Sequence, residues 1–179
     1  MKLLSALVLS SLFFMTSCTT EPSLQKYFVE NSESNDFITV DLSPSLLQIN
    51  ESQFTPEQKA SIATVKKMNI IAFKANDSNQ NKFEAESQKV KQILKNTTYQ
   101  ELMKFNTGDG GASVYFVGKE NKIDEFILFG NEKKNGFAIV RLLGKDMNPS
   151  QFMDILEVIK KSNIDQEQLK PLKALFEKQ

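Results

Sequence analysis

The sequence predicts a single α+β domain in which helices pack on a mixed, mainly antiparallel sheet. Two patterns lead to this fold class. Between residues 24 and 95, segments with the spacing of amphipathic helices alternate with short strand-like runs. From residue 99 to residue 143, four strand-like segments follow one another with only turn residues between them, which is typical of an antiparallel meander. The length of 179 residues suits one such domain.

The region from residue 24 to residue 95 is expected to alternate helices with strands. A short amphipathic helix is predicted where apolar residues lie at positions i, i+3 and i+4, namely Leu24, Tyr27 and Phe28. Thr55, Pro56 and Gln58 supply a capping residue, a proline and a capping-box partner, which predicts a helix from Pro56 to Lys67. The other expected elements are a strand over 37–42, a helix from Pro44 through Ile49, a strand over 68–75 and a helix over 83–95.

The region from residue 99 onward is expected to form a four-strand meander. Its predicted strands are 99–105, 112–117, 123–129 and 137–143. The turns Gly108 to Gly111 and Asn135-Gly136 are predicted to supply residues with positive φ. After the meander, Asn148-Pro149 is predicted to cap a strongly apolar helix, and a weaker helix is predicted from Asp165 through Phe176.

Both faces of this meander are predicted to be apolar. One face is assigned Val114, Phe116, Ile127, Phe129, Phe137 and Ile139, and the other Tyr115, Val117, Phe126, Leu128, Val140 and Leu142. Antiparallel sheets usually keep one polar face. We therefore expect helices of the chain to cover both faces, and the alternative is that one face holds a partner or a ligand.

The composition excludes several common chemistries. With no His and one Cys, the chain cannot build imidazole-based catalysis, a zinc site of imidazoles or paired thiolates, or an intramolecular disulfide. The 22 basic residues equal the 22 acidic ones, which excludes a strongly basic nucleic-acid binder or a polybasic membrane-surface protein. Because no catalytic constellation is recognisable, we expect a protein that is not an enzyme and that uses no cofactor.

The first residues predict export and a lipid anchor. Met1-Lys2 is a short basic start, and residues 3–15 form an apolar run that is too short to span a membrane. The run ends in Met15-Thr16-Ser17-Cys18, which resembles a bacterial lipobox, with Met in the place where Leu is usual. Residues 1–17 are then a signal peptide, and Cys18 accepts the acyl chains, palmitate among them. The alternative is that Cys18 is a plain thiol behind an ordinary secretory signal.

If Cys18 is acylated, residues 18–23 form a short tether between the membrane and a domain over residues 24–179. Five residues span at most about 17 Å, so the folded body must lie close to the bilayer. Thr19 stands where an Asp would be the inner-membrane retention signal of enteric lipoproteins. By that resemblance we expect the outer membrane rather than the inner one, with the periplasmic or surface face left open.

Three short motifs suggest chemistry and then fail on a required residue. Residues 77–81 place oxygen donors at alternate positions, but Lys82 and Gln88 replace the Gly and the Glu of a calcium loop, so no metal site is expected. Ser23 and Lys26 match a Ser-x-x-Lys pattern without its partner motifs, and a helix start is the expected role. The glycine-rich segment 107–111 lacks the end of a phosphate-binding loop and is expected to be a hairpin turn.

The charged residues of the patterned segments are expected to have structural roles. Asp124 and Glu125 are strand neighbours that point to opposite faces and cannot form one dyad. Asp154 and Glu157 share a helix face, which is expected to be solvated and to turn away from the apolar stripe. Arg141 is expected to form an ion pair or to extend toward solvent at the sheet edge, and the alternative is that it holds a carboxylate or a phosphate.

The order of these elements resembles a bacterial family of small exported proteins, the domain of unknown function 4252. The residues that carry the resemblance are the 37–40 strand, Tyr99 to Met103, Ile123 to Ile127, and the strand from Phe137 that ends at Gly144. The resemblance covers about residues 24 to 160 and implies an exported α+β protein, often a lipoprotein, with no assigned chemistry. It also implies that some relatives are encoded beside envelope-stress sigma-factor genes.

These observations predict a lipid-anchored envelope protein that acts as a non-catalytic binding or interaction module. The expected docking element is either the second apolar face of the sheet or the helix from Asn148 to Lys161, and it would hold an envelope partner or a small apolar ligand. The alternative, which depends on the family resemblance alone, is an accessory component of an envelope-stress or sigma-factor pathway. An enzyme that uses Ser, Asp, Glu, Lys or Tyr is the third possibility.

Overall fold

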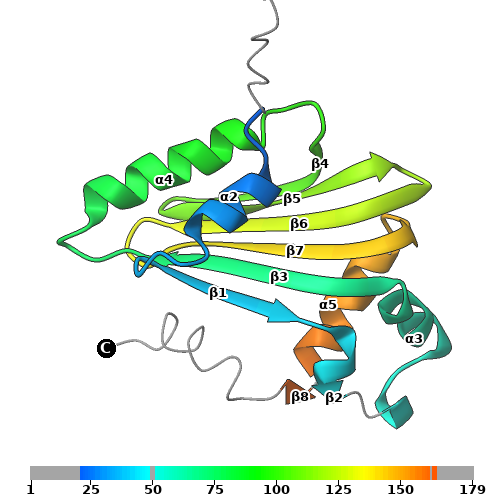
Figure 1. Cartoon of the computed structure of the whole chain (residues 1–179). Helices are drawn as coiled ribbons and strands as arrows, with labels where there is room; N and C mark the ends of the chain where they lie inside the picture. Colours follow the sequence, from blue (N-terminus) through cyan, green and yellow to red (C-terminus); the bar gives the residue numbers. More distant parts are fainter. Residues whose placement is uncertain (1–20, 49–50, 162, 165–179) are drawn as a thin grey trace, which may run out of the picture.

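A six-stranded sheet in the order β1-β3-β7-β6-β5-β4 is the centre of the computed structural model, which describes residues 21–48, 51–161 and 163–164 (Figure 1). Its strands are β1 (Phe37–Leu42), β3 (Val65–Lys74), β4 (Gln100–Thr107), β5 (Gly110–Lys119), β6 (Lys122–Glu132) and β7 (Gly136–Met147). Every strand pair among the described residues is antiparallel, so the mainly antiparallel sheet is confirmed and its expected parallel pair is not found. Strands β4 to β7 form the predicted four-strand meander.

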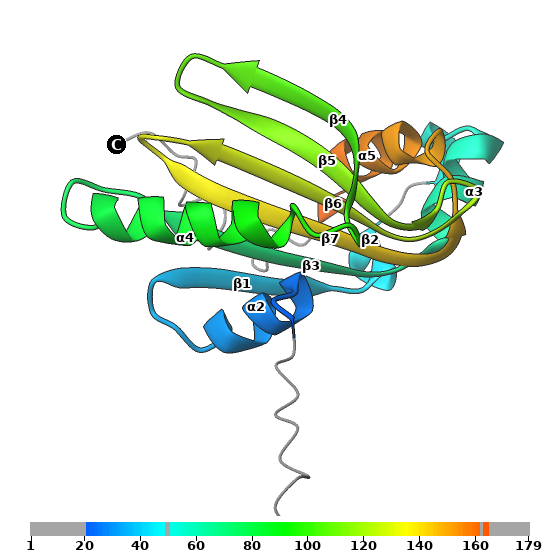
Figure 2. The ribbon, with the colours of Figure 1, turned by 90° about the horizontal axis from the view of Figure 1, so that it is seen from above.

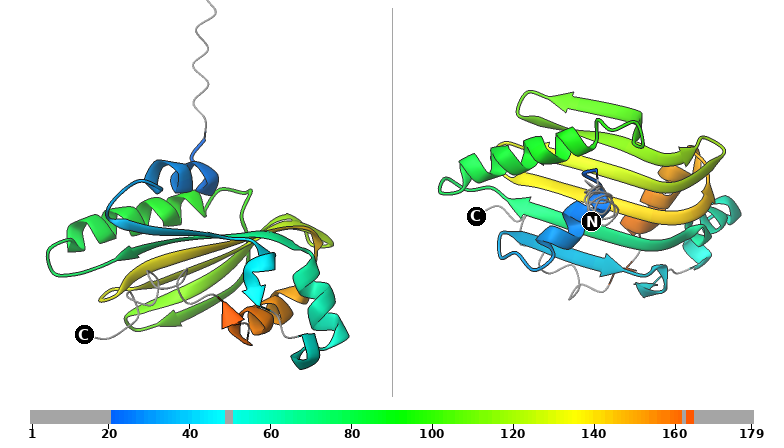
Figure 3. Two further views of the ribbon diagram at one scale, coloured as in Figure 1. Left: turned by 60° about the horizontal axis from the view of Figure 1, so that its bottom comes forward. Right: turned by 45° about the horizontal axis from the view of Figure 1, so that its top comes forward.

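The helices form one layer on each face of the sheet. The principal ones are α2 (Leu24–Asn31), α3 (Pro56–Ala63), α4 (Gln80–Ile93) and α5 (Gln151–Lys161). Helices α2 and α4 cover one face, and α3 and α5 cover the other (Figures 2 and 3). The minor elements are η2 (Pro44–Leu46), η3 (Glu51–Gln53) and the short pair β2 (Leu47–Gln48) and β8 (Asn163–Ile164).

Two apolar cores result, one on each face. Toward α2 and α4 the core is rich in aromatic rings, and Phe73 and Phe137 stack with centroids 5.7 Å apart. Toward α3 and α5 the core contains Phe126 and Phe152, whose centroids are 5.2 Å apart. Coverage of both faces by the chain's own helices, the expected arrangement, is therefore confirmed at the middle of the sheet.

One assignment of the two faces was wrong. The register pairs Val114 with Leu128 and Tyr115 with Ile127. Directly opposed residues of an antiparallel pair lie on the same face. Val114 and Phe116 therefore belong to the α5 side and Tyr115 and Val117 to the α4 side, the reverse of the prediction for this strand.

The predicted helix from Pro56 to Lys67 begins correctly but ends too late. The capping box is present, because Thr55 accepts from the Gln58 backbone N–H and the Gln58 side chain accepts from the Thr55 N–H. The helix stops at Ala63 because β3 begins at Val65, which is buried and pairs with β7, with a bulge before Lys67. Burial and strand pairing outweigh the helical pattern of this segment.

Two other predictions need correction, and a further group concerns residues that the structure does not describe. The helix expected from Pro44 through Ile49 is one 3₁₀ turn followed by β2. Of the glycines expected to adopt positive φ, Gly136 does (111°), whereas none between positions 108 and 111 does. The signal peptide over 1–17, Cys18 and the terminal helix from Asp165 lie outside the described residues.

Candidate apolar binding surface

The α5 side of the sheet carries a shallow hollow that no described helix covers. It lies where small side chains occupy one register row across three strands. Ala138 of β7 pairs with Gly130 of β6, and Gly130 pairs with Ala112 of β5. Ala72 of β3, next in the row, is fully buried. Because these side chains are short, the sheet surface is recessed there, with a cavity volume of about 360 Å³.

Larger apolar residues form the sides of this hollow. Leu128 and Val140 are half-buried in the neighbouring register row, and Phe105 opposes Ala112 at the outer strand β4. The Phe105 ring is 59% exposed, which makes it one of the most exposed large apolar side chains described. We call this surface the open apolar face and define it by Phe105, Ala112, Leu128, Gly130, Ala138 and Val140. Concave apolar surfaces of this size suit small ligands and apolar side chains of partners.

The polar rim of the open apolar face lies at the β6–β7 turn. Glu132 and Asn135 line the hollow there, and the Asn135 amide donates to the Glu132 carboxylate at 2.6 Å. Polar groups at one end and apolar groups on the floor would orient an amphipathic ligand.

A larger groove of about 1130 Å³ lies on the opposite face, between α4 and strands β4 and β5. Its floor includes Ser87, Ser113 and Asn131, and the Asn131 amide donates to the Ser87 hydroxyl at 3.4 Å. Burial and the negative charge of Glu101 raise the pKa of Tyr115, which also lines the groove, and a hydrogen bond with Ser113 opposes this rise. Its rim mixes lysines (Lys91, Lys95, Lys104, Lys133) with carboxylates (Glu84, Glu101, Asp109). The mixed signs give the groove no single charge preference.

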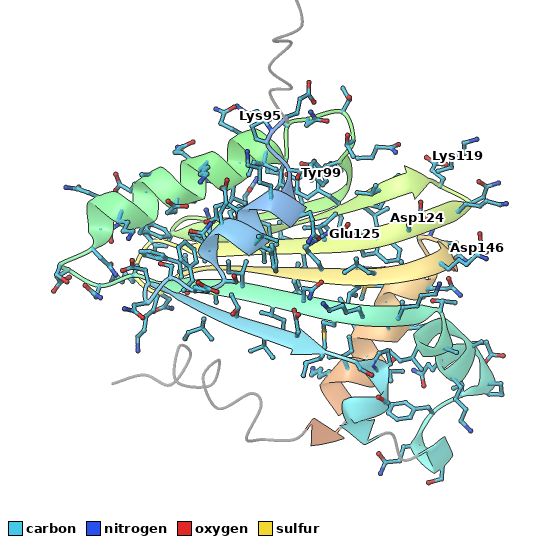
Figure 4. All side chains as sticks on the ribbon, in the orientation of Figure 1. Lys95, Tyr99, Lys119, Asp124, Glu125 and Asp146 are labelled. Carbon is cyan, nitrogen blue, oxygen red and sulfur yellow. The ribbon has the colours of Figure 1, made fainter. Side chains whose placement is uncertain are left out.

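Arg141 forms the predicted ion pair, although it lies in a central strand rather than at the sheet edge. Its Nε and Nη2 donate to the two oxygens of Glu125 at 2.5 and 3.0 Å, and Nη1 donates to Gln25 Oε1 at 2.8 Å. The guanidinium also stacks on the Phe28 ring at 5.2 Å, and the Arg141 side chain is 6% exposed. Because these partners occupy the guanidinium, the alternative role of holding an external anion is not supported. Figure 4 shows Glu125 in the middle of the sheet.

The predicted acidic pairs are only partly confirmed. Glu125 points to the α2 side, where it binds Arg141, so the prediction that it forms no dyad with Asp124 holds. Of the second pair, Glu157 is exposed as predicted and also pairs with Lys161, whereas Asp154 is half-buried beside α3. Asp154 accepts from the Ser61 hydroxyl at 3.0 Å, and Glu157 accepts from the Gln58 amide at 2.9 Å. Helices α3 and α5 lie in contact on the same face of the sheet, and these bonds join them.

The remaining sequence candidates have structural roles. Ser23 caps α2 and accepts from the Lys26 N–H at 3.2 Å, which confirms a helix start. In the loop before α4, Asn76 Oδ1 accepts hydrogen bonds from the backbone N–H and the hydroxyl of Ser78, as in an ordinary polar turn. Within the described residues no group of three potential metal ligands occurs. Cys18, the predicted lipid site, lies outside them.

The helix proposed from Asn148 to Lys161 as a docking element is instead part of the core. Phe152, Ile155 and Val158 of α5 are all buried beneath the sheet, and only Met153 is a large exposed apolar residue of this helix. The hollow was missed because it depends on strand register. Its only sequence signal is the small residues Ala112, Gly130 and Ala138 within otherwise bulky strands. None of the described helices is long and apolar enough to cross a bilayer.

These features define an α+β domain whose antiparallel sheet has helices on both faces and one open apolar surface. The family described as a domain of unknown function (DUF4252) matches residues 27–155. The chain therefore belongs to that family, as the resemblance predicted. The match includes most of both cores and the whole open apolar face. No curated protein matches the chain.

Proposed function

We propose that the protein is a lipid-anchored, non-catalytic binding module of the cell envelope, and that its open apolar face holds an apolar ligand or an apolar segment of an envelope partner. The observation that carries this proposal is the row Ala138, Gly130 and Ala112, which recesses the sheet beside an exposed Phe105. Exposed apolar surface of this kind favours association, because covering it removes apolar area from water.

Other features support a binding role over a catalytic one. The buried Arg141 and Glu125 bind each other, and Asp154 and Glu157 bind residues of α3. These charged groups thus have structural partners. A binding role needs only shape and apolar surface, both of which the hollow supplies.

Gly130 offers a direct test of the hollow. A Cβ at this position would meet no atom within 4 Å, so Gly130→Leu can fill the recess without straining the strand. Gly108, in the β4–β5 turn, also has no atom within 4 Å of an added Cβ, and Gly108→Leu is the matched control. Both variants would be made in soluble protein that carries Cys18→Ala.

The readout is the fluorescence of an apolar dye such as bis-ANS, with the mass in solution measured in parallel. We expect wild-type protein and Gly108→Leu to bind the dye and Gly130→Leu to lose most of that binding. Equal dye binding by all three proteins would reject the hollow as the site. A wild-type protein that binds no dye and is a monomer would show that the chain itself closes this face.

The anchor requires its own experiment. The intact mass of protein purified from the membranes of its host should equal that of residues 18–179 plus acyl chains. The Cys18→Ala variant should lose that mass increment and leave the membrane fraction, since acyl burial contributes about 0.8 kcal/mol per CH₂. A wild-type mass without lipid would remove the anchor from the proposal and leave the binding face untouched.

A further inference from the structure

The residues that follow the proposed anchor are fastened to the folded body. The Asn96 amide donates to Glu21 Oε2 at 3.0 Å, and the Leu24 N–H donates to the Tyr99 hydroxyl at 2.9 Å. Ser23, between them, caps α2. The chain from Glu21 onward therefore lies against the connection between α4 and β4, and Figure 4 shows Lys95 and Tyr99 at this place.

This fastening shortens the tether that the sequence predicts. Only Thr19 and Thr20 separate Cys18 from Glu21. Three residue steps span at most about 10 Å, which is less than the thickness of the three-layered body. A body held this closely cannot present all of its faces to the bilayer equally.

The described chain begins on the side of α2 and α4, opposite α3 and α5 (Figure 3). Charge does not distinguish these two helical layers. Helices α2 and α4 carry four lysines (Lys26, Lys82, Lys89, Lys91) and three glutamates (Glu30, Glu84, Glu86), and Lys82 pairs with Asp36 just outside them. Helices α3 and α5 carry three lysines (Lys59, Lys160, Lys161) and three carboxylates (Glu57, Asp154, Glu157).

We propose that the layer of α2 and α4 faces the headgroups of the membrane that holds Cys18, so that the open apolar face points away from the bilayer. The partner of this surface is the lipid surface itself, which the short tether brings near. The inference depends on the proposed acylation of Cys18. It gives that anchor a second function, because the anchor orients the binding face toward the aqueous side.

Single-cysteine labelling tests this orientation in the anchored protein. Acylation consumes the thiol of Cys18, so a cysteine introduced elsewhere is the only one that a dye can label. Lys95→Cys places the dye at the α4 end beside the tether, and Lys160→Cys places it on α5; both lysines are exposed. The labelled proteins would be reconstituted into vesicles of phosphatidylcholine and phosphatidylglycerol that carry a nitroxide on the headgroup as a contact quencher.

We expect several-fold stronger quenching of the dye at position 95 than at position 160. Equal quenching, or stronger quenching at 160, would overturn the inference while the protein still floats with the vesicles. Protein that carries no lipid and does not float would instead reject the anchor, and the inference would fall with it. The two failures are therefore distinguishable.

A longer tether is the internal control. Ten Gly and Ser residues inserted between Thr20 and Glu21 add a flexible segment of about 17 Å root-mean-square length. The difference in quenching between positions 95 and 160 should then shrink. A difference of unchanged size would overturn the role of the short tether in setting the orientation.

Discussion

Arg141 is a charged residue in the middle of a sheet, and its partners explain how that position is tolerated. The guanidinium is 6% exposed and the Glu125 side chain 13% exposed, so each charge depends on the other for compensation. Removal of one partner of a buried pair leaves the other charge uncompensated and commonly costs about 3 to 5 kcal/mol. We expect Arg141→Met to lower the free energy of unfolding by about 3 kcal/mol in urea denaturation.

The control is the exposed pair of Lys82 and Asp36, whose side chains are 49% and 40% exposed. Lys82→Met should change the free energy of unfolding by less than about 1 kcal/mol. The double variant Arg141→Met with Glu125→Leu should recover most of the loss, because no buried charge remains. A single variant as stable as the wild type would contradict the structural role of this pair.

Asp41 predicts a measurable dependence of stability on pH. Burial pushes the pKa of Asp41 upward, but hydrogen bonds from Lys67 and Asn69 outweigh that effect, and the net pKa lies below its ordinary value. A lowered folded-state pKa contributes stability above the unfolded pKa of about 3.9, and this contribution is lost as the pH falls through the folded-state value.

We therefore expect wild-type protein to be more stable than Asp41→Asn at pH 7, and the difference to shrink on acidification below about pH 4. Because the Asp41 side chain is 63% exposed, solvent screening keeps the difference at about 1 kcal/mol or less. Urea denaturation of both proteins at pH 7 and pH 3 measures it. A difference that grows at pH 3 would have the wrong sign for this pair.

Residue roles could be predicted from the sequence where the interaction is local and not where it is distant. The capping box of Thr55 and Gln58 spans three residues and was predicted correctly. The ion pair of Arg141 was expected, but its partner Glu125 is 16 residues away and Gln25 is 116 residues away. Only the strand register and the position of α2 bring these three residues together.

Among the elements, the β6–β7 turn depends on Gly136. This residue has φ of 111°, and an added Cβ would lie 1.9 Å from the Phe73 carbonyl oxygen. We expect Gly136→Ala to destabilise the protein by about 2 kcal/mol or more, through both backbone strain and this contact. A thermal melt followed by circular dichroism should show a decrease in Tm of about 4 to 8 °C. Gly108→Ala is the control, since its Cβ would meet no atom within 4 Å, and an equal decrease in the two variants would contradict the prediction.

Helix α5 predicts a contrast between two neighbouring residues. Phe152 is 1% exposed and packs on Phe126, whereas Met153 is 59% exposed. We expect Phe152→Ala to cost about 3 to 5 kcal/mol because it leaves a cavity between helix and sheet. Met153→Ala should stay within about 0.5 kcal/mol of the wild type. Urea denaturation compares them, and a large effect of Met153→Ala would indicate that this side chain is covered.

The existence of most elements was predictable, because their apolar spacing and turn residues are local signals. The strand β1 was predicted with its observed bounds, and the apolar face of α4 is buried as expected. The ends were less predictable. Strand β7 continues to Met147, four residues beyond its predicted end, because Ile123 of β6 still pairs with Met147 across a bulge.

At the scale of the whole molecule, the strand order could not be derived from the sequence. Strand β3 lies between β1 and β7, although 61 residues separate the end of β3 from the start of β7 in the numbering of the chain (74 and 136, with both ends excluded). That order determines which side chains share a register row, and so it determines the hollow. The sequence predicted a two-sided apolar meander, and the lengths of α3 and α5 decide how much of it stays open.

The two cores share their strands, and this sharing predicts that the whole domain unfolds as one unit. In β6, Phe126 points into the core beneath α5 and Ile127 into the core beneath α4, and both are fully buried. Neither core can be disrupted without disturbing the strand that supports the other, so a cooperative transition is expected. The chain has no Trp, so Phe83→Trp and Phe152→Trp supply a separate fluorescent reporter for each core.

The two reporter proteins need not be equally stable, so each is compared with its own circular dichroism. We expect the fluorescence and far-ultraviolet transitions of each protein to coincide in urea. Phe137→Ala removes a buried ring from the core beneath α4, and it would be added to each reporter protein. We expect it to lower the free energy of unfolding by about 3 to 5 kcal/mol. The urea midpoints of both reporters should then fall, including that of the reporter beneath α5. If that variant shifted only the reporter at position 83, the two layers would unfold independently and the central strands would not couple them.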